Sequence, residues 1–62
     1  MEKNWLKDIA FETRTVVDPK VKRYITSNWR KVIKICFNDE NKAKRLAQAI
    51  STENLEKIME II

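Results

Sequence analysis

The chain has 62 residues, with no glycine, no histidine, one proline and one cysteine, and a formal net charge of +4. A lone cysteine without histidine excludes an internal disulfide and a zinc site, and the lack of glycine disfavours tight hairpins and phosphate-binding loops. We therefore expect a single all-α domain over residues 1–62, a small bundle of three to four helices without metal or cofactor.

The first predicted helix covers residues 4–17. Its apolar positions fall within an arc of about 140° on a helical wheel, which is typical of an amphipathic helix. They are Trp5, Leu6, Ile9, Ala10, Thr13, Val16 and Val17. Phe11 lies well outside this arc, so we expect it to be exposed or to make a second contact. Asp18 and Pro19 mark the next boundary, because aspartate caps helix N-termini and proline suits the first helical position.

The second predicted helix runs without interruption over residues 19–37. Its apolar positions sweep about 220° of the wheel, which is more than one neighbouring helix covers. They are Val21, Tyr24, Ile25, Trp29, Val32, Ile33, Ile35, Cys36 and Phe37. We expect this second helix to be central in the bundle, packed on two sides or forming an oligomer interface. Cys36 lies inside the apolar arc and is predicted to be a small buried hydrophobe.

Two further helices are predicted after residue 37, and the last of them is short. Asn38 and Asp39 are expected to cap the third, and Ser51 or Thr52 the fourth. Apolar residues recur at helical spacing in both: Ala43, Leu46, Ala47 and Ile50, then Leu55, Ile58, Met59 and Ile62. Both patterns predict one buried stripe per helix.

Charge is concentrated in the middle of the chain, where residues 20–45 hold nine bases and two acids. Five of these bases lie within about 100° of one another on the predicted second helix, opposite its apolar arc. We call them the basic ridge: Lys20, Arg23, Arg30, Lys31 and Lys34. The ridge is a solvated face, or a partner for Glu53, Glu56 and Glu60, or a site for an external anion. Three carboxylates cannot neutralise five cations, so the surplus favours an external anionic partner.

Catalysis has little support in the sequence. Without histidine the chain has no Cys/His or Ser/His pair, and its carboxylates at helical spacing are expected on an open face. We therefore predict a protein that is not an enzyme. Acids and bases precede the first apolar run, and no stretch approaches the ~18 apolar residues of a membrane span, which predicts a cytoplasmic protein.

The leading functional interpretation is a small regulator or inhibitor that docks on an acidic face of a larger protein. The basic ridge is the predicted contact, with Phe11 as an apolar anchor. The alternative is a nucleic-acid-binding protein that adds Lys42, Lys44 and Arg45 to the same surface. A membrane-active cationic peptide is disfavoured by the nine acids, which anionic headgroups repel.

Self-association is also predicted, as a homodimer. The chain is shorter than the ~70–80 residues at which a lone core usually suffices, and it lacks a disulfide and a metal site. The second predicted helix is apolar over more of its surface than one neighbour covers. The basic ridge and the acidic side of the last helix are complementary in charge, and a two-fold interface uses that pairing twice.

Overall fold

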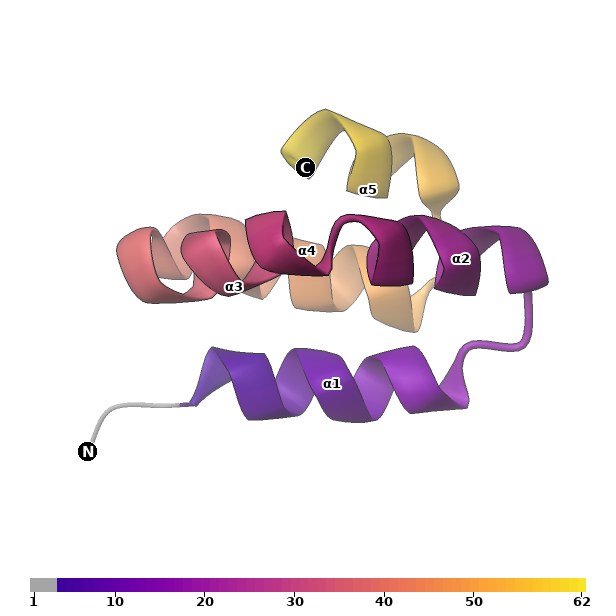
Figure 1. Ribbon diagram of the computed structural model, residues 1–62, viewed down its shortest axis with the longest axis horizontal. Helices are drawn as coiled ribbons and strands as arrows, with labels where there is room; N and C mark the ends of the chain where they lie inside the picture. Colours follow the sequence, from indigo (N-terminus) through magenta and orange to yellow (C-terminus); the bar gives the residue numbers. More distant parts are fainter. Residues whose placement is uncertain (1–3) are drawn as a thin grey trace.

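The computed structural model describes residues 4–62, which form five helices (Figure 1). Their bounds are α1 Trp5–Thr15, α2 Pro19–Ser27, α3 Trp29–Asn38, α4 Glu40–Ser51 and α5 Leu55–Ile61. No strand is present in this part of the chain. The predicted all-α class is confirmed, whereas the predicted number of three to four helices is too low.

The second predicted helix is not continuous, because it ends and restarts at Asn28. This residue has φ −109° and ψ 23°, which departs from helical geometry. The side-chain amide of Asn28 donates to the carbonyl of Tyr24 at 2.9 Å, and its backbone N–H donates to the same carbonyl at 3.1 Å. Asparagine competes with the helical backbone in this way. The single helix predicted for residues 19–37 is therefore α2 and α3, which extend in roughly the same direction in Figure 1.

The central helix is α4 rather than the predicted second helix. It contacts α1, α3 and α5, and it buries Ala43, Leu46, Ala49 and Ile50. Two of these four are alanines, whose small side chains let neighbouring helices approach closely. The sequence interpretation failed because it required the whole apolar arc to be covered by packing, whereas on α3 Phe37 remains 75% exposed and Trp29 and Ile33 are only half-buried.

The core draws apolar side chains from all five helices. Its buried members are Ile9, Val16, Val21, Ile25, Val32, Ala43, Leu46, Ala49, Ile50 and Ile58. Three positions on the predicted apolar stripes are exposed instead: Val17 at 85%, Phe37 at 75% and Met59 at 54%. Val17 is exposed because α1 already ends at Thr15, which places Val17 in the connection to α2. Met59 lies about 100° around α5 from Ile58, the buried residue of this helix.

Local capping explains where α2 and α4 begin. The Asp18 carboxylate accepts from the N–H of Lys20 at 2.9 Å, and the Asp39 carboxylate accepts from the N–H of Lys42 at 3.1 Å. Each bond satisfies a backbone donor that the first turn of a helix leaves without an internal partner. The predicted helix boundaries at Asp18 and Asp39 are confirmed.

The boundary predicted at Ser51 or Thr52 is wrong, because α4 ends in a left-handed turn at Glu53. This residue has φ 53°, a conformation that glycine favours and that this glycine-free chain gives to a glutamate. The N–H of Glu53 donates to Ile50 and that of Asn54 donates to Ala49, each at 3.0 Å, which is the Schellman pattern. Asn54 then caps α5.

The side chain of Glu53 ties this turn to the connection between α1 and α2. Its carboxylate oxygen Oε1 accepts from the N–H of Val17 at 3.2 Å and from the N–H of Asp18 at 2.9 Å. The sequence interpretation placed Glu53 on the acidic side of the last helix. The structure instead uses it as a link between two connections 35 residues apart in the chain.

Candidate interaction surface

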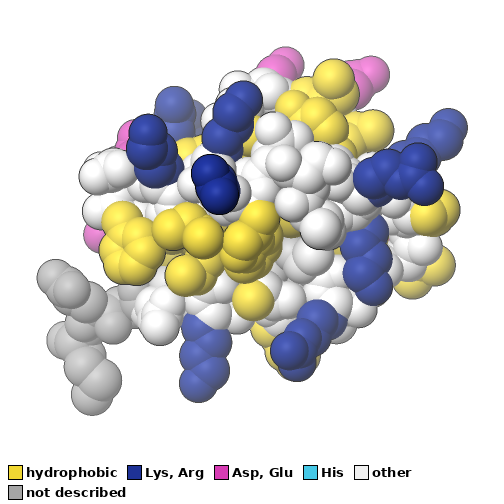
Figure 2. Space-filling view, in the orientation of Figure 1, with side chains coloured by type: hydrophobic (Ala, Val, Ile, Leu, Met, Phe, Trp, Pro, Cys, Tyr) yellow, Lys and Arg dark blue, Asp and Glu magenta, His cyan; other side chains and the backbone are white. Residues whose placement is uncertain are grey.

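An apolar stripe runs along the outer side of α3. Trp29, Ile33 and Phe37 are spaced four residues apart, so successive members turn about 40° around the helix. Trp29 and Ile33 are half-buried, and Phe37 is 75% exposed. We call these three residues the α3 stripe. Figure 2 shows hydrophobic side chains gathered over α3 where it borders α1.

Basic residues lie directly beside the α3 stripe. On the same wheel Arg30 and Lys34 follow Phe37 within about 60°, and Lys31 comes next. All three are exposed, and Figure 2 shows Lys and Arg side chains next to the hydrophobic ones over α3. We use the name α3 surface for the α3 stripe together with Arg30, Lys31 and Lys34. It combines an uncovered aromatic ring with three cations on one helix.

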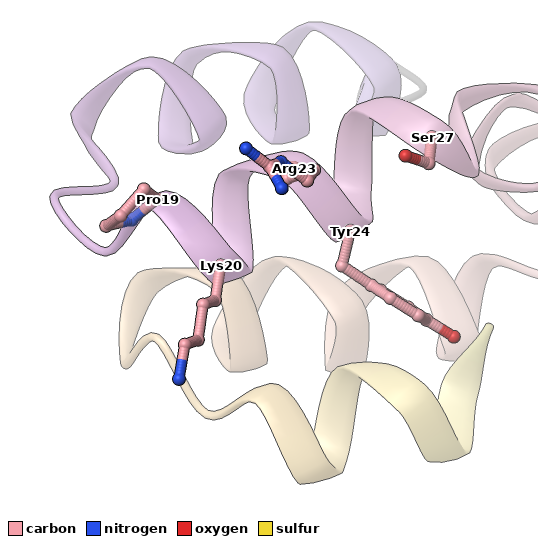
Figure 3. Close-up of a pocket in the computed structure, with 5 residues that line it drawn as sticks. All are labelled: Pro19, Lys20, Arg23, Tyr24 and Ser27. Carbon is pink, nitrogen blue, oxygen red and sulfur yellow. The ribbon is translucent and has the colours of Figure 1, made fainter.

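The other two members of the basic ridge belong to α2. Lys20 and Arg23 are exposed and line an open hollow of about 370 Å³ together with Pro19, Tyr24 and Ser27. In Figure 3, Lys20 and Tyr24 point toward the side where α5 lies, whereas Arg23 projects in a different direction. The break at Asn28 therefore divides the predicted ridge into a pair on α2 and a trio on α3.

Phe11 lies on another face of the molecule. It is 65% exposed and lines a groove of about 440 Å³ between α1 and α4, to which Trp5 and Lys44 also contribute. The indole N–H of Trp5 donates to the carboxylate of Glu40 at 3.3 Å across the same pair of helices. The apolar residues beside the α3 cations are thus Trp29, Ile33 and Phe37 rather than Phe11.

The sequence analysis missed the α3 stripe as part of a surface because it counted these residues as candidates for the core. One signal was present in the sequence. An apolar arc of about 220° exceeds what one packed neighbour covers, so part of it had to remain on the surface or meet a partner. The stripe is that remainder.

The nucleic-acid interpretation adds three basic residues, Lys42, Lys44 and Arg45, to the basic ridge. These three residues lie on two different sides of α4. Lys42 and Arg45 line a groove of about 400 Å³ between α4 and α5, together with Lys57 and Glu60. Lys44 lines the groove between α1 and α4. This division follows from helical geometry, because residues two apart point about 200° away from each other.

The outer side of α5 is acidic. Glu56 and Glu60 are exposed, and Met59 between them is 54% exposed. Figure 2 shows acidic and hydrophobic side chains together at the upper edge of the molecule, over α5. Within residues 4–62, neither carboxylate makes an ion pair with the basic ridge. The internal pairing considered from the sequence is therefore not formed in this structure.

Reactive groups are sparse in the described part of the chain. Cys36 is half-buried, and desolvation by burial raises the pKa of its thiol, which keeps the sulfur protonated and weakly nucleophilic. Among residues 4–62, no group of three or more His, Cys, Asp and Glu side chains is placed to hold a metal ion.

A search of those same residues for an apolar helix long enough to cross a membrane finds none. No protein-family model, curated protein or solved structure matches the chain.

Proposed function

We propose that this chain is a non-enzymatic interaction module, a small regulator or inhibitor that docks on an acidic face of a larger cytoplasmic protein. The observation that carries this proposal is the α3 surface, where the exposed ring of Phe37 lies beside Arg30, Lys31 and Lys34. Lys20 and Arg23 on α2 extend the cationic surface beyond Asn28.

The apolar part of the α3 surface supplies affinity. Protein interfaces concentrate binding energy in a few aromatic and arginine side chains that become fully desolvated at their centre. Covering the exposed part of Phe37 contributes roughly 1–2 kcal/mol to the free energy of binding through the burial of apolar area alone. Trp29 and Ile33, both half-buried, enlarge the apolar contact along the same side of α3.

The cations supply orientation and selectivity. Exposed charges at the edge of an interface add little affinity each, but they speed association with an acidic surface and penalise a basic one. The partner surface that fits is therefore an apolar patch or groove with carboxylates along one edge. This requirement is narrower than acidity alone, because a uniformly charged surface would leave Phe37 uncovered.

Nucleic acid is the second candidate. It uses the same cations with Lys42, Lys44 and Arg45, and the exposed ring of Phe37 beside Arg30 is the type of group on which a base stacks. The placement of Lys42 and Lys44 on different sides of α4 argues against a continuous track for a phosphate backbone. We therefore rank this function below protein docking.

Capture from a nuclease-treated lysate of the native host tests the proposal. Three baits are compared: the parent chain, the double variant Arg30→Glu/Lys34→Glu, and the control Lys7→Glu/Arg14→Glu on α1. Both variants lower the formal net charge from +4 to 0, so they differ only in where the charge is reversed. We expect a protein that is retained by the parent and by the control but lost by the α3 variant.

Salt dependence separates the two candidates. Anisotropy with generic duplex and single-stranded probes at two salt concentrations should show no binding, or weak binding, if the chain docks on protein. Tight binding that falls steeply with salt would instead support the nucleic-acid function, because phosphate contacts release counterions.

A further inference from the structure

The groove between α1 and α4 is acidic on one side and basic on the other. Its α1 side carries Asp8 and Glu12, and its α4 side carries Lys44. The ring of Phe11 on α1 is 65% exposed, whereas the α4 side includes the short side chain of Ala47. We use the name α1–α4 groove for the hollow of about 440 Å³ lined by Trp5, Asp8, Phe11, Glu12, Lys44, Ala47, Gln48 and Ser51.

Helices α1 and α4 run parallel in a defined register. Near their N-terminal ends, the indole N–H of Trp5 donates to the carboxylate of Glu40. Just beyond their C-terminal ends, the N–H of Asp18 donates to the carboxylate of Glu53. Each bond joins residues 35 positions apart, and Figure 1 shows both helices running from left to right. A residue of α1 therefore lies level with the α4 residue about 35 positions later.

This register fixes the height of the groove residues along the helices. Lys44 lies level with a point between Asp8 and Glu12, and about 4.5 Å of helix rise separates it from Glu12. A lysine side chain spans that height. Phe11 lies level with the turn of α4 that holds Ala47. Acid, base and exposed ring thus lie at similar heights on opposite sides of one groove.

Two-fold symmetry allows two ways of aligning the helices of a second copy on this groove. The axis of such a pair lies in the plane of the contact. An axis along the helices exchanges the two sides, so that α1 of each copy lies over α4 of the other at unchanged height, with Glu12 against Lys44. An axis across the middle of the groove instead turns the acidic side of each copy onto the acidic side of the other, which is repulsive. The charges therefore select the axis along the helices.

We propose that a second copy of this chain occupies the α1–α4 groove, with α1 of each copy packed parallel on α4 of the other. The exposed ring of Phe11 then lies over the low part of the other copy's α4, at the height of Ala47. Glu12 of each copy lies beside Lys44 of the other. Each contact is made twice, because the two-fold axis repeats it.

The distribution of charge favours a second copy over a partner of one sign. A ligand that is uniformly basic or uniformly acidic meets a side of like charge in this groove, whereas the exchange of the two sides in a dimer pairs each sign with its opposite. The length of the chain argues in the same direction. A domain of 62 residues without a disulfide is in the size range in which self-association commonly supplements a small core.

This dimer has a consequence that rests on the proposed function. The residues that line the α1–α4 groove come from α1 and α4, so the α3 surface of both copies stays open in the dimer. The pair then presents two docking surfaces. A partner with two suitable sites, or with two copies, binds such a pair more tightly than a monomer through the raised effective concentration of the second surface.

Single charge reversals test the contact on the purified chain without any partner. Sedimentation equilibrium from low to high micromolar concentration is compared for the parent, for Glu12→Lys and for Lys44→Glu. We expect the parent to dimerise and each variant to dimerise roughly tenfold more weakly, because like charges then face each other in both contacts. An equimolar mixture of the two variants should recover association. In the mixed pair, opposite charges face each other at both contacts, which pairing within one chain cannot produce.

The apolar part of the contact is tested by two exposed phenylalanines. Phe11→Ala should weaken the dimer at least roughly tenfold, because it removes the central aromatic ring from both contacts. Phe37→Ala on α3 is the matched control and should dimerise like the parent. Lys31→Glu on α3 and Glu56→Lys on α5 are the controls for net charge and should also dimerise like the parent. Far-ultraviolet circular dichroism confirms that each variant remains helical.

Three results would overturn this inference. A constant mass of 7.4 kDa for the parent would exclude the dimer. Equal association of Phe11→Ala and Phe37→Ala would place the interface outside the groove, and a mixture no stronger than its separate variants would exclude the pairing of Glu12 with Lys44. None of these results touches the proposed function, which is measured by capture of a partner. Conversely, the dimer is measured without a partner and stands if no partner is captured.

Discussion

The left-handed turn at Glu53 provides a sharp test of how the fold is held together. An L-residue with φ 53° is strained, and the residue remains there because its carboxylate binds the N–H groups of Val17 and Asp18. Backbone strain and side-chain bonding therefore oppose each other at one position. Three substitutions separate them: Glu53→Ala removes the bonds and keeps the strain, Glu53→Gly removes both, and Glu53→Gln keeps an acceptor oxygen without the charge.

The expected magnitudes follow from these contacts. Two hydrogen bonds of 2.9 and 3.2 Å to a half-buried carboxylate, partly replaced by water when lost, contribute about 1–2 kcal/mol to the free energy of unfolding. Glycine relieves the left-handed strain and so restores about 1 kcal/mol of the free energy of unfolding. We therefore expect Glu53→Ala to lower stability by about 1–2 kcal/mol, and both Glu53→Gly and Glu53→Gln to lower it by about 0–1 kcal/mol.

Urea unfolding followed by circular dichroism at 222 nm measures these differences, and thermal melting gives a second estimate. For a domain of this size 1 kcal/mol corresponds to roughly 4–8 °C in Tm. The informative comparison is glycine against alanine at position 53, since both lack the carboxylate. An alanine variant as stable as the glycine variant, or more stable, would show that residue 53 is not held in a left-handed conformation.

Three further predictions concern the core, a cap and the thiol. Ile58→Ala should lower the free energy of unfolding by about 2–5 kcal/mol, because Ile58 is fully buried. Met59→Ala on the same helix should lower it by less than about 1 kcal/mol, because Met59 is exposed. Equal losses in denaturant titrations would contradict the assignment of Ile58 to the core. Asp39→Ala should cost about 1 kcal/mol and Asp39→Asn much less, since asparagine also caps; an unchanged melting temperature for alanine would count against the cap. Burial raises the pKa of Cys36, so at equal pH iodoacetamide should alkylate the folded chain more slowly than the urea-unfolded chain; equal rates would show an unprotected thiol.

Sequence patterns predicted well the features that depend on interactions between residues close together in the chain. The starts of α2 and α4 follow from Asp18 and Asp39, whose carboxylates bond to backbone groups two or three residues ahead. Such bonds need no tertiary context, so the residue type alone identifies them. The buried stripe of α4 is also periodic enough to be read directly, because Ala43, Leu46 and Ile50 recur at helical spacing.

Features that depend on distant contacts were not predictable in the same way. Glu53 in a left-handed turn is stabilised by backbone groups more than 30 residues earlier, and its residue type argues for a helix start. The break at Asn28 has no proline or glycine to signal it. The α3 stripe was misassigned for a related reason, because Phe37 has the residue type of a core position and only the packing of its neighbours decides that it is uncovered.

The proposed function requires that the α3 surface is where this chain meets its partner. The most direct test is a titration of the ¹⁵N-labelled chain with the captured partner, followed by amide chemical shifts in heteronuclear NMR spectra. At a few micromolar we expect changes concentrated in residues 29–38, with smaller ones at Lys20 and Arg23, and little change along α1. Changes centred instead on the groove of Phe11 and Lys44 between α1 and α4 would contradict it.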